Sequence, residues 1–245
     1  MKHYIDFHED VSFEDLKYML EISEEMKAKT KAGIKHHYLE GKSLAMIFTK
    51  SSTRTRVSFE VGMYQLGGQA LFLSNNDIQI GRGETIYDTA NVLSGMVDGI
   101  MIRTFKHSDI EDLAKYGKIP VINGLSDDQH PTQALADLLT IKEHKGGLKG
   151  LKLAYVGDGN NVTASLLQAC AKAGMDISCA SPADYTCGKK YVDQALEDAK
   201  VSGSKILMTT DPFEACDGAD VIYTDTWTSM GQESEKASRV EIFKN

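Results

Sequence analysis

The sequence predicts an α/β protein of two tandem domains, each a parallel sheet flanked by helices. Two observations predict this. Short apolar runs alternate with longer amphipathic stretches, and a polar, glycine-rich segment, KGGLKG at residues 145–150, interrupts the alternation once. Strands separated by helical crossovers pair in parallel, and helices then cover both faces of the sheet. We therefore expect one domain over residues 1–146 and a second over residues 150–245.

The first half of the chain predicts four strands and five helices. Ser12, with Asp15 three residues later, is typical of a helix start, and the amphipathic pattern then runs through Thr30. The expected strands are Leu44–Phe48, Ala70–Leu73, Gly99–Arg103 and Pro120–Asn123. The other expected helices are Thr53–Gln65, Glu84–Met96, Ile110–Tyr116 and Pro131–His144, the last with proline in its first turn.

The second half predicts four more strands. They are Leu151–Val156, Asp176–Ala180, Lys205–Met208 and Val221–Thr224, with helices at Val162–Ala173 and Lys189–Lys200. Ligands of open parallel sheets bind beyond the carboxyl ends of the strands. The segments discussed below all lie at such ends, so we expect the functional sites there.

Composition excludes several classes of protein. The net charge of −8 argues against broad contact with nucleic acid, which needs a basic face, but a few local cations can still bind a small anion. No apolar run is long enough to cross a membrane, and the polar N-terminus lacks the pattern of a signal peptide. The four cysteines form no CxxC pair. We expect a cytoplasmic protein with buried thiols and no contact with membrane.

The segment KSSTRTR at residues 50–56 follows a predicted strand and begins a predicted helix. Unpaired N–H groups and the dipole at a helix N-terminus favour an anion, hydroxyl groups add donors, and arginine matches phosphate oxygens. Composition alone leaves a second interpretation open, a capped helix whose arginines lie on a solvated face.

The string Ser52–Arg56 resembles the carbamoyl-phosphate motif Ser-Thr-Arg-Thr-Arg of the aspartate/ornithine carbamoyltransferase family. The resemblance implies that Ser52, Thr53, Arg54 and Thr55 bind the phosphate of carbamoyl phosphate. It also implies that Arg54 and Thr55 reach the carbonyl oxygen. The two-domain α/β fold expected above is the fold of that family.

Two further segments are similar to family motifs. Arg103 ends the run GIMIR and matches an arginine that bridges phosphate and carbonyl oxygen. In the string HPTQ at residues 130–133, the resemblance implies that His130 donates to the carbonyl oxygen and that Gln133 orients the carbamoyl NH2. Donors aimed at this oxygen would stabilise the negative charge that develops as an amine attacks. Arg54, Arg103 and His130 are therefore the expected catalytic residues.

The loop NNDIQIGRGET at residues 75–85 is long, polar and glycine-containing, which suits a mobile active-site loop. Family members are homotrimers in which this loop crosses to the neighbouring subunit's active site. The resemblance implies that Gln79 contacts phosphate there.

The second domain determines the acceptor. GDGNN at residues 157–161 does not match GxGxxG, so we expect no nucleotide cofactor. DTWTSMG at residues 225–231 is similar to the DxxxSMG loop of family members that use ornithine. The implied ornithine ligands are Asn161, Asp225, Ser229 and Met230. We expect carbamoyl transfer to the δ-amine of L-ornithine, without metal or cofactor; aspartate or putrescine as acceptor is the alternative.

The resemblance breaks off at the C-terminus. Family members continue through a His-Cys-Leu-Pro motif that contains a catalytic cysteine, and then through a final helix, but this sequence ends at Asn245. We expect a truncated sequence of a genuine enzyme with an incomplete second sheet. The alternatives are a natural short paralogue that binds carbamoyl phosphate with little turnover, and a chain that folds and retains weak activity.

Overall fold

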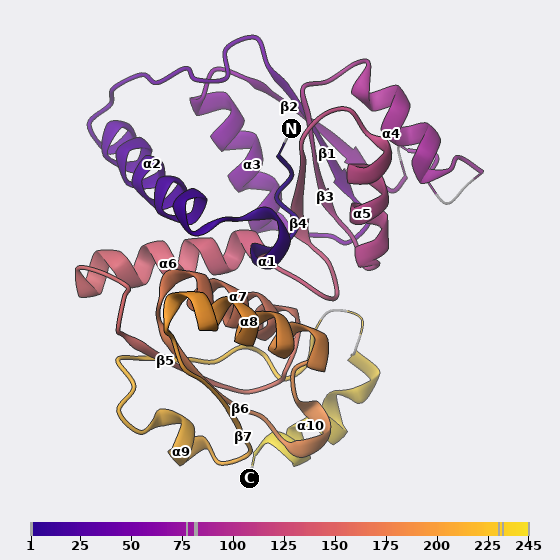
Figure 1. Cartoon of the computed structure of the whole chain (residues 1–245). Coiled ribbons are helices and arrows are strands. Elements are labelled where there is room, and N and C mark those ends of the chain that lie inside the picture. The colour runs from indigo at the N-terminus through magenta and orange to yellow at the C-terminus, as the bar shows by residue number, and fades with distance from the viewer. Residues whose placement is uncertain (1, 77, 81–82, 230, 232, 245) are drawn as a thin grey trace. The chain divides into compact units, whose positions relative to one another are not determined.

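The computed structural model describes residues 2–76, 78–80, 83–229, 231 and 233–244, and within them it confirms the α/β class. Two four-stranded parallel sheets are flanked by helices (Figure 1). The chain divides into two compact units, Met1–Thr132 and Gln133–Asn245. The domain limits expected from the sequence, 1–146 and 150–245, stay a prediction.

The first unit contains one sheet with the strand order β2-β1-β3-β4. Helices precede, connect and follow the strands. The elements in chain order are α1 (Phe7–Asp10), α2 (Phe13–Lys31), β1 (Ser43–Phe48), α3 (Thr53–Gln65), β2 (Gln69–Ser74), α4 (Ile86–Ser94), β3 (Gly99–Arg103), α5 (His107–Tyr116) and β4 (Val121–Leu125). Helix α6 (Pro131–Lys145) begins at the end of the first unit and lies mostly in the second.

Strand β1 shows why helices cover both faces of this sheet. Its side chains alternate between the two faces, as in any strand. Ala45 and Ile47 belong to one buried cluster with residues of α4 and α5, including Ala90 and Leu113. The other β1 side chains pack with Met63 of α3 in a second cluster. Figure 1 accordingly shows α4 and α5 on one side of the sheet and α3 on the other.

The second unit has the strand order β7-β6-β5-β8, also fully parallel. Helices α7 and α8 pack on each other, and α9 packs against β5, β6 and β7. The elements are β5 (Lys152–Val156), α7 (Asn161–Ala173), β6 (Asp176–Ala180), η1 (Ala183–Tyr185), α8 (Lys189–Ser202), β7 (Ile206–Thr209), α9 (Pro212–Cys216), β8 (Val221–Tyr223), η2 (Glu233–Glu235) and α10 (Lys236–Phe243).

Each sheet has one point where the strand order reverses direction. In the first unit β1 lies beside β3, and their connections leave towards opposite edges. In the second unit the connection after β5 leads to β6 on one side, whereas β8 pairs with β5 on the other side. The loops that follow such neighbouring strands diverge and leave a crevice, which is where ligands bind in open α/β sheets. The topology therefore places one candidate site in each unit.

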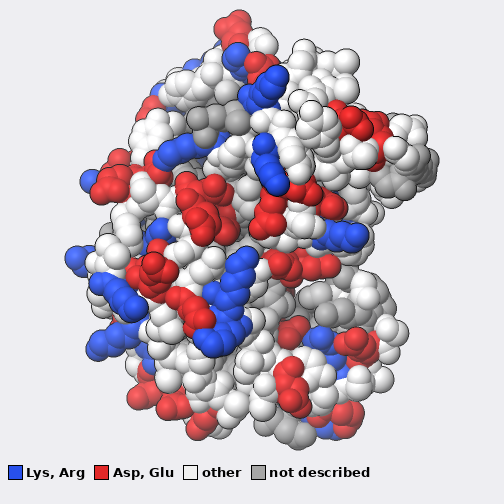
Figure 2. Space-filling view, turned by 45° about the vertical axis from the view of Figure 1, so that its right-hand side comes forward, with Lys and Arg blue, Asp and Glu red and all other residues white. Residues whose placement is uncertain are grey.

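The distribution of charged side chains and the apolar character of the helices describe the surface further. On the face drawn in Figure 2, Lys and Arg side chains are interspersed with Asp and Glu rather than gathered into one basic area. Among the described residues, no helix has both the length and the apolar character needed to span a membrane.

Candidate functional site

The crevice of the first unit lies between the ends of β1 and β3, where hydrogen bonds continue the pairing beyond the strands. The Thr49 backbone N–H donates to the Arg103 carbonyl oxygen at 3.0 Å, and the Thr49 hydroxyl donates to the Thr104 hydroxyl at 3.0 Å. These contacts fix the segment that leads from β1 into α3 beside the end of β3. The phosphate-motif residues and Arg103 are thus held at one edge of one sheet.

Ser52 determines where α3 begins. It is the N-cap residue, and its hydroxyl oxygen accepts a hydrogen bond from the Thr55 backbone N–H at 3.2 Å. The Ser52 hydroxyl in turn donates to the Thr55 hydroxyl at 3.0 Å. The N–H groups of the first helical turn have no partner within a helix, so those of Thr53 and Arg54 point out of the start of α3. The expected phosphate residues therefore surround a helix N-terminus.

Arg103 is a buried cation at the end of β3. Its side chain is buried, and its Nε has no hydrogen-bond partner among the described residues. Burial lowers the pKa of Arg103, and the positive charge of Arg54 lowers it further. No carboxylate of the described residues forms an ion pair with either guanidinium. Two neighbouring cations without a counter-ion favour binding of an anion between them.

His130 lies in the same electrostatic environment. Burial, Arg103 and Lys50 together lower the pKa of His130 to about 4, so its imidazole is neutral at pH 7. A neutral imidazole still carries one N–H that can donate a hydrogen bond. The structure therefore places His130 near Arg103 and Lys50 and gives it a form suited to a donor.

Lys50 was not foreseen as a site residue. Its side chain is buried, its Nζ forms an ion pair with Asp127 at 2.9 Å, and it lies 4.9 Å from the centre of the Phe105 ring. The positive charge of Lys50 is one of the causes that lower the pKa of His130. The position of Lys50 directly before the hydroxyl-rich motif could have indicated a site residue. Its burial could not be predicted, because it depends on the tertiary structure.

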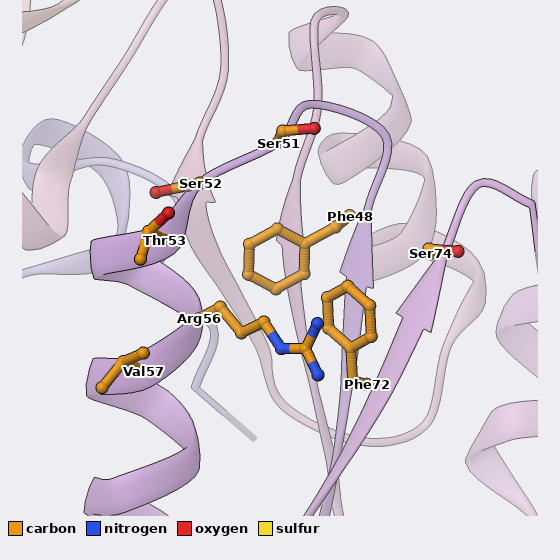
Figure 3. A pocket seen from close by; sticks show the side chains of 8 residues that line it. All are labelled: Phe48, Ser51, Ser52, Thr53, Arg56, Val57, Phe72 and Ser74. Carbon is orange, nitrogen blue, oxygen red and sulfur yellow. The ribbon is translucent and has the colours of Figure 1, made fainter.

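A cavity of about 370 Å³ adjoins the phosphate motif (Figure 3). Hydroxyl side chains line one side and aromatic rings the other; the lining residues are Phe48, Ser51, Ser52, Thr53, Arg56, Val57, Phe72 and Ser74. Figure 3 shows Arg56 reaching from α3 towards the two phenyl rings. Its guanidinium carbon lies 3.5 Å from the centre of the Phe72 ring, and its Nε donates to Glu60 at 3.0 Å. Both motif arginines are exposed, but they differ in their contacts: Arg56 stacks on Phe72 and pairs with Glu60, whereas Arg54 forms no ion pair with a described carboxylate.

The two expected glutamines, Gln79 and Gln133, form hydrogen bonds with residues other than Arg54 and Arg103. Gln79 is exposed in the loop before α4, where its backbone carbonyl oxygen accepts from the Glu84 backbone N–H at 3.3 Å. Gln133 is exposed in the first turn of α6 and donates to Asp137 at 2.9 Å. Among the described residues, no hydrogen bond joins either side chain to Arg54 or Arg103.

In the second unit, a hydrogen bond between Asn160 and Asp225 joins the loops that follow β5 and β8. Asn160 is the N-cap of α7, and its side-chain oxygen accepts from the N–H groups of Val162 and Thr163 at 2.9 and 3.2 Å. Its Nδ2 donates to Asp225 Oδ2 at 3.2 Å. The other oxygen of Asp225 accepts from the Thr226 N–H at 2.7 Å. Asp225 is therefore an oriented carboxylate, suited to accept hydrogen bonds from an ammonium group.

The other residues expected to bind the second substrate are partly described. Asn161 is the first residue of α7, next to the Asn160 cap, and is half-buried. Ser229 is half-buried in the loop after β8. Met230 lies outside the described residues. The structure adds Asn160, which directly precedes α7 because that helix begins one residue earlier than expected, and asparagine is favoured at such a cap position.

Arg239 of α10 fixes the two loops of this crevice and was also not foreseen. Its Nη1 donates to Asp158 in the loop after β5 at 2.8 Å and to the Trp227 carbonyl oxygen in the loop after β8 at 3.1 Å. Both charged groups of the Arg239–Asp158 pair are buried. In the same loop a Cβ on Gly159 would lie 2.1 Å from the backbone nitrogen of Cys187, so only glycine fits there.

Comparison with known protein families matches both halves of the chain. Residues 2–143 match the model described as aspartate/ornithine carbamoyltransferase, carbamoyl-P binding domain. Residues 149–245 match the model described as aspartate/ornithine carbamoyltransferase, Asp/Orn binding domain. The two matches leave only residue 1 and residues 144–148 uncovered.

Individual relatives and solved structures agree with the family models. An ornithine carbamoyltransferase of Bacillus subtilis is 59% identical over 238 residues, which cover 96% of this chain and 72% of the relative. One of Anoxybacillus flavithermus is 58% identical over 234 residues, which cover 96% and 74%. The structure of the Pyrococcus furiosus ornithine carbamoyltransferase has a TM-score of 0.95 at 52% identity and covers 99% of this chain and 77% of that one. The chain thus spans about three-quarters of the length of these proteins.

Proposed function

Since this chain belongs to the aspartate/ornithine carbamoyltransferase family and is a carbamoyltransferase, we propose that it transfers the carbamoyl group of carbamoyl phosphate to the δ-amine of L-ornithine. The products are citrulline and phosphate. The observation that carries the proposal is the pair formed by Arg54 and Arg103, two neighbouring guanidinium groups without a carboxylate among the described residues. An anion of the shape of a phosphate supplies the missing counter-charge.

Carbamoyl phosphate is bound by the residues around the start of α3. The hydroxyl groups of Ser52, Thr53 and Thr55 and the N–H groups of the first helical turn donate to the phosphate oxygens. Arg54 and Arg103 supply its counter-charge and also reach the carbonyl oxygen. Gln79 adds a contact to the phosphate from the loop before α4.

The chemical step is attack of the neutral δ-amine on the carbamoyl carbon. A nitrogen–carbon bond forms, negative charge develops on the carbonyl oxygen, and donors from Arg54, Arg103 and His130 stabilise it. The bond between this carbon and the phosphate oxygen then breaks with its electron pair. The proton lost by the attacking nitrogen is balanced by a proton gained by the departing phosphate. Gln133 holds the carbamoyl NH2 and so orients the carbon for attack.

L-ornithine is bound at the crevice of the second unit. Asp225 accepts from the α-ammonium group, and its orientation by Asn160 supports this role. Asn161 and the segment at Ser229 and Met230 donate to the α-carboxylate. A substrate with an ammonium and a carboxylate on one carbon satisfies both kinds of group, whereas putrescine has no carboxylate and aspartate carries a second one.

We further propose that the working assembly is a homotrimer with active sites at subunit interfaces. The support is the family membership together with the exposure of Gln79, whose side chain has no hydrogen bond to the arginine pair among the described residues. A neighbouring subunit could supply this residue to the site.

The experiment that tests the acceptor is a comparison of initial rates with L-ornithine, L-aspartate and putrescine at one concentration of carbamoyl phosphate. We expect carbamoylated product with ornithine and at least 100-fold less with the other two. A faster reaction with aspartate or putrescine would contradict the proposed acceptor. Binding of carbamoyl phosphate without turnover of any acceptor would instead identify a binding protein.

A further inference from the structure

Asp137 is a half-buried carboxylate one helical turn after Gln133, and the mechanism above does not use it. Residues four apart on a helix lie on the same side, and Gln133 Nε2 donates to Asp137 Oδ1 at 2.9 Å. The Tyr223 hydroxyl at the end of β8 lies near enough to influence the pKa of Asp137, and Asp137 Oδ2 is buried without a hydrogen-bond partner among the described residues. The hydrogen bond that holds this carboxylate is therefore the one from Gln133.

The chemistry of this pair determines which way the Gln133 amide faces. An ionised carboxylate can only accept hydrogen bonds, so the NH2 end of the amide must face Asp137. The carbonyl end, Oε1, then faces away from it. A carbamoyl NH2 has only donors to offer, so its partner must be an acceptor, and Oε1 of Gln133 is one.

We propose that Asp137 is a positioning residue that fixes the orientation of the Gln133 amide and thereby presents Oε1 to the carbamoyl NH2. This inference rests on the proposed function, in which Gln133 contacts that group. It assigns to Asp137 a role in recognising the carbamoyl part of the substrate and none in binding its phosphate.

The surroundings of Asp137 support a carboxylate that accepts. Burial raises the pKa of Asp137, the hydrogen bond from Gln133 and the nearby Tyr223 hydroxyl lower it, and the negative charge of Asp225 raises it. Both Gln133 and Tyr223 stabilise the charged form. An asparagine of nearly the same shape would lack this selectivity, because its NH2 could donate to Gln133 Oε1 and turn the amide around.

The test compares two ligands that share the phosphate but differ in the carbamoyl group. Titration calorimetry gives the dissociation constants of carbamoyl phosphate and inorganic phosphate for the unaltered chain, Asp137→Asn, Gln133→Ala and the double variant. Asp193→Asn is the matched control, because Asp193 accepts from Lys189 four residues earlier on α8. Urea unfolding of each variant reports separately that its second unit is folded.

We expect Asp137→Asn and Gln133→Ala each to weaken carbamoyl phosphate about tenfold, the value of one hydrogen bond, and to leave phosphate unchanged. The double variant should lose no more than Gln133→Ala alone, since Asp137 acts through Gln133. Additive losses, equal weakening of both ligands, or no effect of Asp137→Asn would overturn the inference. No effect of Gln133→Ala would overturn it together with the role of Gln133, and failure of the unaltered chain to bind either ligand would contradict the proposed function itself.

Discussion

The guanidinium group of Arg103, buried at the end of β3, lies close enough to that of Arg54 for the charge of Arg54 to lower the pKa of Arg103. Like charges repel, and the Nε of Arg103 has no partner among the described residues. This arrangement is unfavourable in the absence of a ligand and becomes favourable when an anion lies between the two groups. Such destabilised arrangements are typical of binding sites rather than of structural cores.

Replacing Arg103 should therefore separate stability from binding. Arg103→Met removes a buried charge with an unpartnered donor, so the free energy of unfolding without ligand should stay the same or rise by about 1 kcal/mol. Phosphate binding should weaken at least tenfold. Urea unfolding and calorimetry measure the two quantities, with Lys118→Met, an exposed cation before β4, as control. A variant that is clearly less stable yet binds phosphate normally would contradict this account.

His130 predicts a dependence of stability on pH. Its pKa is about 4 in the folded protein and about 6.5 in an unfolded chain. Above pH 6.5 neither state protonates the ring. Between pH 6.5 and 4 the unfolded state binds a proton that the folded state does not, so the free energy of unfolding falls as the pH falls. His130→Gln should remove this contribution, as urea unfolding at pH 7 and pH 5 would show. An unaltered pH dependence in the variant would mean that His130 is not the group responsible.

Asn160 has two separable roles, capping α7 and holding Asp225. Asn160→Ala should lower the free energy of unfolding by about 1 kcal/mol, whereas Asn160→Ser should largely retain the cap. Both should raise the KM for ornithine severalfold, because Asp225 loses the donor that orients it. The KM for carbamoyl phosphate should not change.

The control for Asn160 is Asp211→Ala, which removes the N-cap of α9. It should lower stability without changing either KM. If Asn160→Ser has an unaltered KM for ornithine, the contact with Asp225 does not contribute to acceptor binding.

The buried pair of Arg239 and Asp158 should contribute strongly to the stability of the second unit. Arg239→Ala leaves a buried carboxylate uncompensated, so we expect a loss of about 3 kcal/mol in the free energy of unfolding. Lys189→Ala is the matched control, because its ion pair with Asp193 is exposed and should contribute less than about 0.5 kcal/mol. Urea unfolding distinguishes the two, and equal losses would show that the Arg239 pair is not a structural anchor.

The elements with a clear apolar pattern could be predicted from the sequence. The expected limits of Thr53–Gln65, Gly99–Arg103 and Asp176–Ala180 are those of α3, β3 and β6. The helix Lys236–Phe243 was missed because its buried residue is Arg239, so its inward face depends on charge rather than apolar spacing. The helix Pro212–Cys216 was missed because five residues show too little periodicity, although Asp211 and Pro212 are typical of a helix start.

The residues of the candidate sites that belong to sequence motifs could be predicted. Short strings place Ser52–Arg56, Arg103 and His130 at strand ends, and the structure brings them to one sheet edge. The roles implied for these residues stay predictions. The pair of Arg56 and Glu60 follows from their spacing of four residues on the expected helix. The stacking of Arg56 on Phe72 and the contact of Asn160 with Asp225 could not be predicted, because each joins segments whose proximity arises only from folding.

The central claim is most directly tested by the rate of citrulline formation from carbamoyl phosphate and L-ornithine in three proteins: the unaltered chain, Arg54→Ala and Lys118→Ala. The two variants each lose one positive charge from the first unit, Arg54 beyond the carboxyl end of the sheet and Lys118 before its amino end. We expect formation of citrulline that Arg54→Ala lowers at least 100-fold and that Lys118→Ala leaves unchanged. Similar rates in the unaltered chain and Arg54→Ala, or no citrulline from the folded unaltered chain, would contradict the account.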